Sequence, residues 1–227
     1  MSKVDQLLEK RFRLNMSRIA GMVQHLSSSD ALKPAQLFGD SEVVRADILR
    51  SIVVFLHATF EVVLRSHLPR PNRSLSFYSR SDLDKALRLS NIDATTFRDL
   101  YPPLTEMAKR RKRIVYEADL SDDTSPQWGI ADDWQLIMWL LAVPAFYYRL
   151  RLSSNPAASA DQSRYDGLRS AMRDHVAFGN QLVAFPKVQR ALRLQALQES
   201  VNTLNRVIAT LQVGDDASVV TEGLPLL

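Results

Sequence analysis

Five consecutive cations, Lys109 to Arg113, are followed by an apolar pair, an aromatic residue and two acids. Such basic runs are typical of solvated helix faces and of surfaces that bind polyanions such as RNA. At about 100° per residue of helix, the apolar residues of this segment fall within roughly 60° of Arg111. They are Leu104, Met107, Ala108, Ile114, Val115 and Ala118. We therefore expect Arg111 in the middle of an apolar stripe. The other cations of the run are expected outside it: Lys109, Arg110, Lys112 and Arg113.

A guanidinium group on a core or interface face needs a partner, because a buried and unpaired charge costs several kcal/mol or more. Two interpretations of Arg111 follow. It is a phosphate ligand at an interface, or it pairs with an acid on a neighbouring helix. The other four cations are candidates for RNA binding, and the alternative for them is an ordinary solvated face.

The segment from Lys109 to Asp119 resembles the signature helix of HEPN domains, particularly the RiboL-PSP-HEPN type with its Arg-x4-His unit. Arg111 matches the arginine, Ile114 and Val115 match the apolar pair, and Ala118-Asp119 matches the end of the motif. Tyr116 stands where the family has histidine. A second segment, residues 45–65, resembles the long helix that precedes the signature. The resemblance covers about residues 1–152.

The resemblance implies a homodimer in which the signature helices of two protomers meet, with metal-free RNA cleavage between them. Arginine would stabilise the phosphate, and histidine would handle the proton of the 2′-hydroxyl. Tyrosine has a reference pKa of about 10, against about 6.5 for histidine, so an unperturbed Tyr116 is a poor general base at pH 7. Tyr116 can still stack on a base or pack at the interface. If the chain is an enzyme, the resemblance implies a metal-independent endoribonuclease, in a setting such as prokaryotic defence or toxin systems.

His57 is the best candidate for a replacement base. His57, Glu61 and Arg65 lie at i, i+4 and i+8, which places them in one polar line along an otherwise apolar helix. A pair between His57 and Glu61 would orient the imidazole and raise its basicity. The alternative is a core histidine beside structural ion pairs. With four scattered histidines and no cysteine, the sequence does not predict a metal site. It also lacks a glycine-rich phosphate loop, so we expect no cofactor.

The composition favours an all-α protein. The 227 residues include 46% hydrophobic residues but only seven glycines, and the net charge is +4. The absence of cysteine suits the reducing cytoplasm, and the first six residues show no apolar signal segment. The apolar stretch from Leu136 to Tyr148 is shorter than the roughly 20 residues that cross a membrane, so we expect a buried helix there and no membrane association.

Apolar periodicity and capping residues predict the order of the helices. They are expected over residues 3–27, 41–67 and 81–89, briefly after Asn91-Ile92-Asp93, from Tyr101 through the signature, and over 133–152. We therefore predict an antiparallel HEPN-like helical bundle over residues 1–152. Residues 153–213 are predicted to form a helical extension, with helices over 160–178 and from about 186, and residues 214–227 a flexible tail. The seam from Leu194 to Leu211 is expected to pack back on the core as a hairpin.

Two functions remain open from the sequence. The first is an RNA-binding or RNA-cleaving HEPN protein, in which Arg111 holds phosphate and Tyr116 or His57, with Glu61, completes the site. The second is a catalytically inactive HEPN module that serves as a dimerisation and partner-binding scaffold, with the helix of residues 186–211 as its docking surface.

Overall fold

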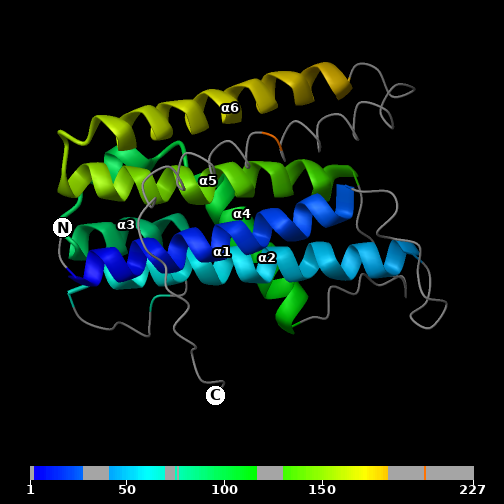
Figure 1. Ribbon diagram of the computed structural model, residues 1–227, viewed down its shortest axis with the longest axis horizontal. Helices are drawn as coiled ribbons and strands as arrows, with labels where there is room; N and C mark the ends of the chain where they lie inside the picture. The colour runs from blue at the N-terminus through cyan, green and yellow to red at the C-terminus, as the bar shows by residue number, and fades with distance from the viewer. Residues whose placement is uncertain are drawn as a thin grey trace, which may run out of the picture.

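The computed structural model describes residues 3–27, 41–69, 75, 77–116, 130–183 and 202. Within these residues the chain forms six α-helices and one short 3-10 helix, and no β-strand, which confirms the all-α prediction. The elements are α1 (Lys3–Ser27), α2 (Ser41–Ser66), α3 (Arg80–Leu89), η1 (Ala94–Phe97), α4 (Tyr101–Tyr116), α5 (Ile130–Ser154) and α6 (Ser159–Val183). Figure 1 shows the long helices side by side, with α4 set across them.

The helix ends follow local capping chemistry. The Ser79 hydroxyl accepts a hydrogen bond from the Asp82 amide at the start of α3, and Asp93 caps η1 in the same way through Thr95. Two predicted boundaries differ from the structure: α5 begins at Ile130, three residues before the predicted start at 133, and α6 continues to Val183, beyond the predicted end at 178.

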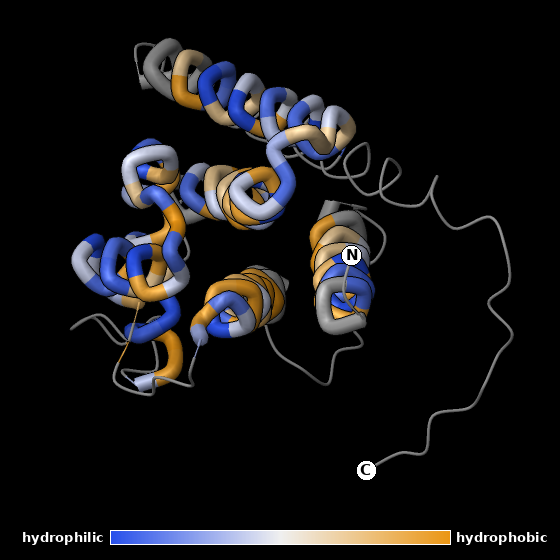
Figure 2. The backbone as a smooth tube through the Cα atoms, turned by 90° about the vertical axis from the view of Figure 1, so that its left-hand side faces the viewer, coloured by the Kyte–Doolittle hydropathy of each residue, from blue (hydrophilic) through white to orange (hydrophobic). Residues whose placement is uncertain are grey.

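Helix α5 is the centre of the bundle. Its residues from Leu136 to Tyr148 are buried on every side except at Met138, which is half-buried. A helix that is apolar all round needs neighbours on all its faces. Here α2, α4 and α6 pack against it, and α1 reaches it through a ring stack of Phe12 on Tyr147 with centroids 3.9 Å apart. Figure 2, which views the long helices nearly end on, shows the most hydrophobic stretches on α2 and α5.

Helix α6 runs antiparallel to α5 after a tight turn at Asn155–Ala158. Its apolar residues Tyr165, Leu168 and Met172 belong to the same hydrophobic core as α5. The first part of the predicted extension therefore packs directly on the bundle. The seam from Leu194 to Leu211 and the tail lie outside the described residues.

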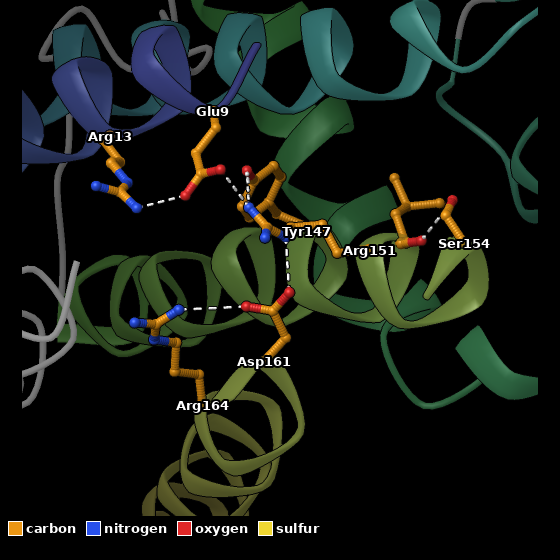
Figure 3. A network of polar contacts seen from close by, with 8 residues as sticks. Glu9, Arg13, Tyr147, Arg151, Ser154, Asp161 and Arg164 are labelled. Atoms are coloured by element: carbon orange, nitrogen blue, oxygen red, sulfur yellow. Dashed lines mark hydrogen bonds and ion pairs between the residues drawn. The ribbon is translucent and has the colours of Figure 1, made fainter. Parts of the chain in front are cut away.

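A polar network fastens the end of α5 to α1 and α6 (Figure 3). Arg151 Nη1 lies 2.6 Å from Glu9 Oε2, and Arg151 Nε donates to Asp161 Oδ2 over 2.7 Å. Each carboxylate has a second guanidinium partner, Arg13 for Glu9 and Arg164 for Asp161. Because Glu9 and Asp161 are both buried, these contacts satisfy charges that would otherwise oppose folding.

We expect Arg151→Met to lower the free energy of unfolding by about 2 kcal/mol, because it keeps the aliphatic stem but removes two charge-assisted hydrogen bonds from buried carboxylates. Urea denaturation followed by circular dichroism measures the change. Arg173→Met, at an exposed position of α6, is the control and should change stability by less than about 0.5 kcal/mol. Equal stabilities of the two variants would show that the network contributes nothing to the fold.

None of the helices in the described part of the chain is long and apolar enough to cross a membrane. In Figure 1, α4 crosses behind α1 and α2, and its C-terminal end emerges beyond α2. The first half of α4 is anchored by Tyr101, Leu104, Met107 and Ala108, which are all buried. The cations of the signature segment lie on the half that emerges.

Candidate anion-binding site at the end of helix α4

Arg111 is half-buried on α4 and contacts two phenol groups. Its Nη1 donates to the Tyr78 hydroxyl over 2.9 Å, and its guanidinium carbon lies 5.6 Å from the centroid of the Tyr116 ring. Against the lowering effect of its partial burial, both phenols contribute to raising the pKa of Arg111. No carboxylate among the described residues pairs with Arg111. The expected alternative, an intramolecular ion pair on a neighbouring helix, is therefore not found in this part of the chain.

The other cations of the run differ in exposure. Lys109, Lys112 and Arg113 are exposed, and Lys109 forms an ion pair of 2.7 Å with Glu106 on the same helix. Tyr116 is 67% exposed at the end of the helix. The surface at the end of α4 thus combines an exposed aromatic ring with several cations. Glu117 and Asp119, the acids of the motif, lie outside the described residues.

Two details of the predicted apolar stripe are wrong. Arg110, expected outside the stripe among the RNA-binding cations, is buried with 6% exposure, whereas Val115, expected inside it, is 45% exposed. Arg110 is three residues from Met107, so the two lie about 60° apart on the helix, on the side that packs into the bundle. Val115 lies past the point where α4 leaves the core. Arg110 therefore does not contribute to the exposed basic surface.

His57 lies on α2 and is almost completely buried, with 2% exposure. Its Nδ1 is 3.9 Å from Glu61 Oε2, which is longer than a hydrogen bond. Burial lowers the pKa of His57 from 6.5 to about 4; the charge of Glu61 opposes this, and the charges of Arg111 and Arg65 add to it. Glu61 thus raises the basicity of His57 as expected, but desolvation and two nearby cations outweigh this one carboxylate, so the net pKa is lowered.

Glu61 forms its hydrogen bonds with Arg65 and not with His57. Arg65 Nε and Nη2 both donate to Glu61 Oε1, over 2.9 and 2.6 Å, and Nη2 also donates to the Leu75 carbonyl over 3.0 Å. The Arg65 guanidinium lies over the Phe77 ring, 4.8 Å from its centroid. The predicted polar line of His57, Glu61 and Arg65 exists. Its acid, however, pairs with the arginine, and the arginine fastens the chain around residue 77 to α2.

Tyr78 lies between Arg111 on α4 and His57 on α2 and contacts both. Its ring lies nearly parallel to that of His57, with centroids 6.3 Å apart, while its hydroxyl accepts the hydrogen bond from Arg111. The preceding residue, Phe77, is fully buried and has a φ of 57°, in the left-handed region that bulky residues rarely adopt. Successive side chains of an extended strand point to opposite faces, and the left-handed turn lets Phe77 and Tyr78 both face the bundle.

Sequence reasoning missed Tyr78 because it follows a stretch rich in arginine, asparagine and serine that predicts a polar loop. The only signal was the aromatic pair Phe77-Tyr78 within that loop. Tyr78 connects Arg111, which lies over the Tyr116 ring, to His57 on α2, and Glu61 lies one helical turn from His57.

The arrangement suits anion binding better than acid–base chemistry. Arg111 is accessible, and its partners among the described residues are phenols, so an oxyanion gains a charge-assisted interaction by replacing one of them. The buried His57, with its lowered pKa, is a weak base at pH 7. Among the described residues no group of three or more histidine, aspartate or glutamate side chains is placed to hold a metal ion.

Comparison with protein-family models, curated proteins and solved structures finds no match to this chain. The function is therefore argued from the residues and their geometry.

We expect the stability of the protein to fall by about 2 kcal/mol between pH 7.5 and pH 5 on account of His57. Its folded pKa of about 4 is below the unfolded value of 6.5. The contribution of the neutral imidazole is therefore present above pH 6.5 and is lost as the pH falls from 6.5 towards 4. Burial lowers the pKa of His175 on α6 in the same way, to about 4.

Urea denaturation at the two pH values measures this dependence. His57→Asn should remove about half of the pH-dependent change, and His57→Asn combined with His175→Gln should remove most of it. A pH dependence that is unchanged in His57→Asn would mean that His57 is not buried in its neutral form.

Proposed function

We propose that this chain is a HEPN-like RNA-binding protein in which Arg111 holds a phosphate group. The observation that carries the proposal is the environment of Arg111. It is a half-buried guanidinium whose partners in the described residues are the hydroxyl of Tyr78 and the ring of Tyr116, at the end of a helix with further exposed cations. A phosphate offers this group a stronger, charge-assisted interaction than a phenol does.

The neighbouring side chains support single-stranded RNA as the polyanion. Tyr116 is 67% exposed beside Arg111, and an exposed aromatic ring next to a phosphate ligand is a platform on which an unpaired base stacks. Lys112 and Arg113 are exposed one and two residues further along α4 and attract the backbone electrostatically.

The proposed activity is binding with little or no cleavage. Metal-free hydrolysis through the 2′-hydroxyl needs a group that accepts a proton near neutral pH. Tyr116 replaces the motif histidine, and His57 is buried behind Tyr78 with its pKa lowered to about 4. The motif position thus holds no imidazole, and His57 is a weak base at pH 7.

The same helix end is proposed as the contact between two copies of the chain. Val115 and Tyr116 are large apolar side chains exposed to 45% and 67%, and they lie next to each other beyond the core. Exposed apolar residues that are adjacent mark interaction surfaces more often than scattered ones do. The second candidate function, a dimerisation scaffold without RNA, rests on this observation.

We expect Arg111→Ala to weaken binding of a short single-stranded RNA by about 10-fold or more, since it removes a charge-assisted hydrogen bond of about 1.5–3 kcal/mol. Fluorescence anisotropy at fixed ionic strength measures the affinity. Lys112→Ala is the matched control: it removes an exposed cation one residue away and should weaken binding by no more than about 3-fold. Sedimentation of both variants should show the same oligomeric state as the wild type.

Three further results would redirect the proposal. Equal losses in both variants would indicate a general electrostatic attraction without a phosphate ligand at Arg111. Very weak binding by the wild type, with an intact dimer, would favour the scaffold. Cleavage of the RNA by the wild type in the presence of EDTA would show that a base is active despite the substitution at Tyr116.

A further inference from the structure

A second candidate site lies where the link between α3 and η1 meets the end of α5. It is a surface pocket of about 340 Å³ that includes Asn91 and Asp93 from the link, Thr96 from η1, and Arg149 and Ser153 from α5. It shares no residue with the site around Arg111. Ligand pockets usually measure about 300–1,000 Å³, so this one suits a small molecule and not a macromolecule.

Arg149 supplies the positive charge of the pocket. Its side chain is half-buried, and its Nε is buried without a hydrogen-bond partner in the described structure. Its guanidinium lies 5.7 Å from the centroid of the Tyr165 ring, but no carboxylate among the described residues lies within ion-pair distance of it. Because Arg149 lines the pocket and has no carboxylate partner among the described residues, its guanidinium is available to a ligand carboxylate.

Asp93 supplies the negative charge. Its carboxylate accepts hydrogen bonds from the Thr95 amide over 2.9 Å and from the Thr95 hydroxyl over 2.8 Å. These bonds, with a smaller contribution from the charge of Arg149, lower the pKa of Asp93 and keep it ionised at neutral pH. Arg149 and Asp93 thus line one pocket and influence each other electrostatically, yet they do not form an ion pair.

We propose that this pocket binds a free α-amino acid, with the ligand carboxylate on Arg149 and its ammonium group near Asp93. One cation and one anion that face the same space without pairing are complementary to a zwitterion. A dianionic phosphate is disfavoured, because the lining charges cancel and Asp93 repels it. A guanidinium also matches the planar geometry of a carboxylate.

The remaining lining fits the rest of such a ligand. Asn91, Thr96 and Gln162 offer hydrogen-bonding groups, and Ile92 with Leu152 offers an apolar wall for a side chain. The inference does not depend on the proposed RNA function, because the two sites have no residue in common.

Isothermal titration calorimetry of the full chain with each standard amino acid tests the proposal. The amino acid that binds most tightly is then compared with its N-acetyl derivative and with its amide. We expect saturable binding of at least one amino acid. Each derivative, which lacks one of the two charges, should bind about 10-fold more weakly or worse. Arg149→Gln and Asp93→Asn should each weaken the amino acid to a similar extent, while Arg173→Gln, at an exposed position of α6, should bind as the wild type does.

Asp93→Asn keeps the ability to cap η1, so a loss of binding in this variant does not reflect a loss of the local fold. Circular dichroism verifies that all three variants are folded. The proposal is overturned if no amino acid binds saturably, if the derivatives bind as well as the parent, or if both Arg149→Gln and Asp93→Asn keep the wild-type affinity.

Discussion

The burial of α5 on all its faces is the constraint on which the rest of the molecule depends. From Leu136 to Tyr148 almost every side chain is inside the protein, so the helix requires α2, α4 and α6 around it and a ring contact from α1. At the C-terminal end of α5 a second requirement arises, because two buried carboxylates there need positively charged partners. Arg151 meets it by bonding Glu9 and Asp161 at once, and this sets how α1 and α6 meet α5.

The same constraint determines what the candidate site can do. Helix α4 packs against α5 and α2 with its first half, and its second half passes beyond the core. Arg111 lies near this boundary, where it is partly desolvated and still accessible. His57 lies on α2, inside the boundary, and its neutral form is favoured by burial and by two cations. The accessible guanidinium of Arg111 and the buried imidazole of His57 therefore lie in one cluster, which favours anion binding over proton transfer.

The sequence was sufficient for the parts of the structure that depend on local patterns. Helix periodicity and caps predicted α1 to α4 within a residue or two, because apolar spacing and residues such as Ser79 act locally. The grouping of His57, Glu61 and Arg65 also followed from their spacing. What the pattern could not supply was the position at which α4 leaves the core. The exposure of Val115 and the burial of Arg110 both depend on it.

Tertiary contacts account for the rest of the differences. Tyr78 reaches Arg111 across 33 positions of the chain, next to a buried Phe77 with a left-handed backbone and against the ring of His57. The pKa of His57 depends on burial and on Arg111, neither of which follows from helix spacing, as well as on Glu61 and Arg65, which do. The pocket of Asp93 and Arg149 likewise joins two segments whose separate patterns predicted only a turn and a buried helix.

The central claim is that Arg111 contacts a phosphate of a bound RNA, and the salt dependence of binding tests it most directly. Each phosphate contact to a single strand contributes about −0.7 to the slope of log affinity against log salt concentration. We expect Arg111→Ala to make this slope less negative by about 0.7 relative to the wild type. Parallel lines for the two proteins would contradict the account, because Arg111 would then neutralise no phosphate.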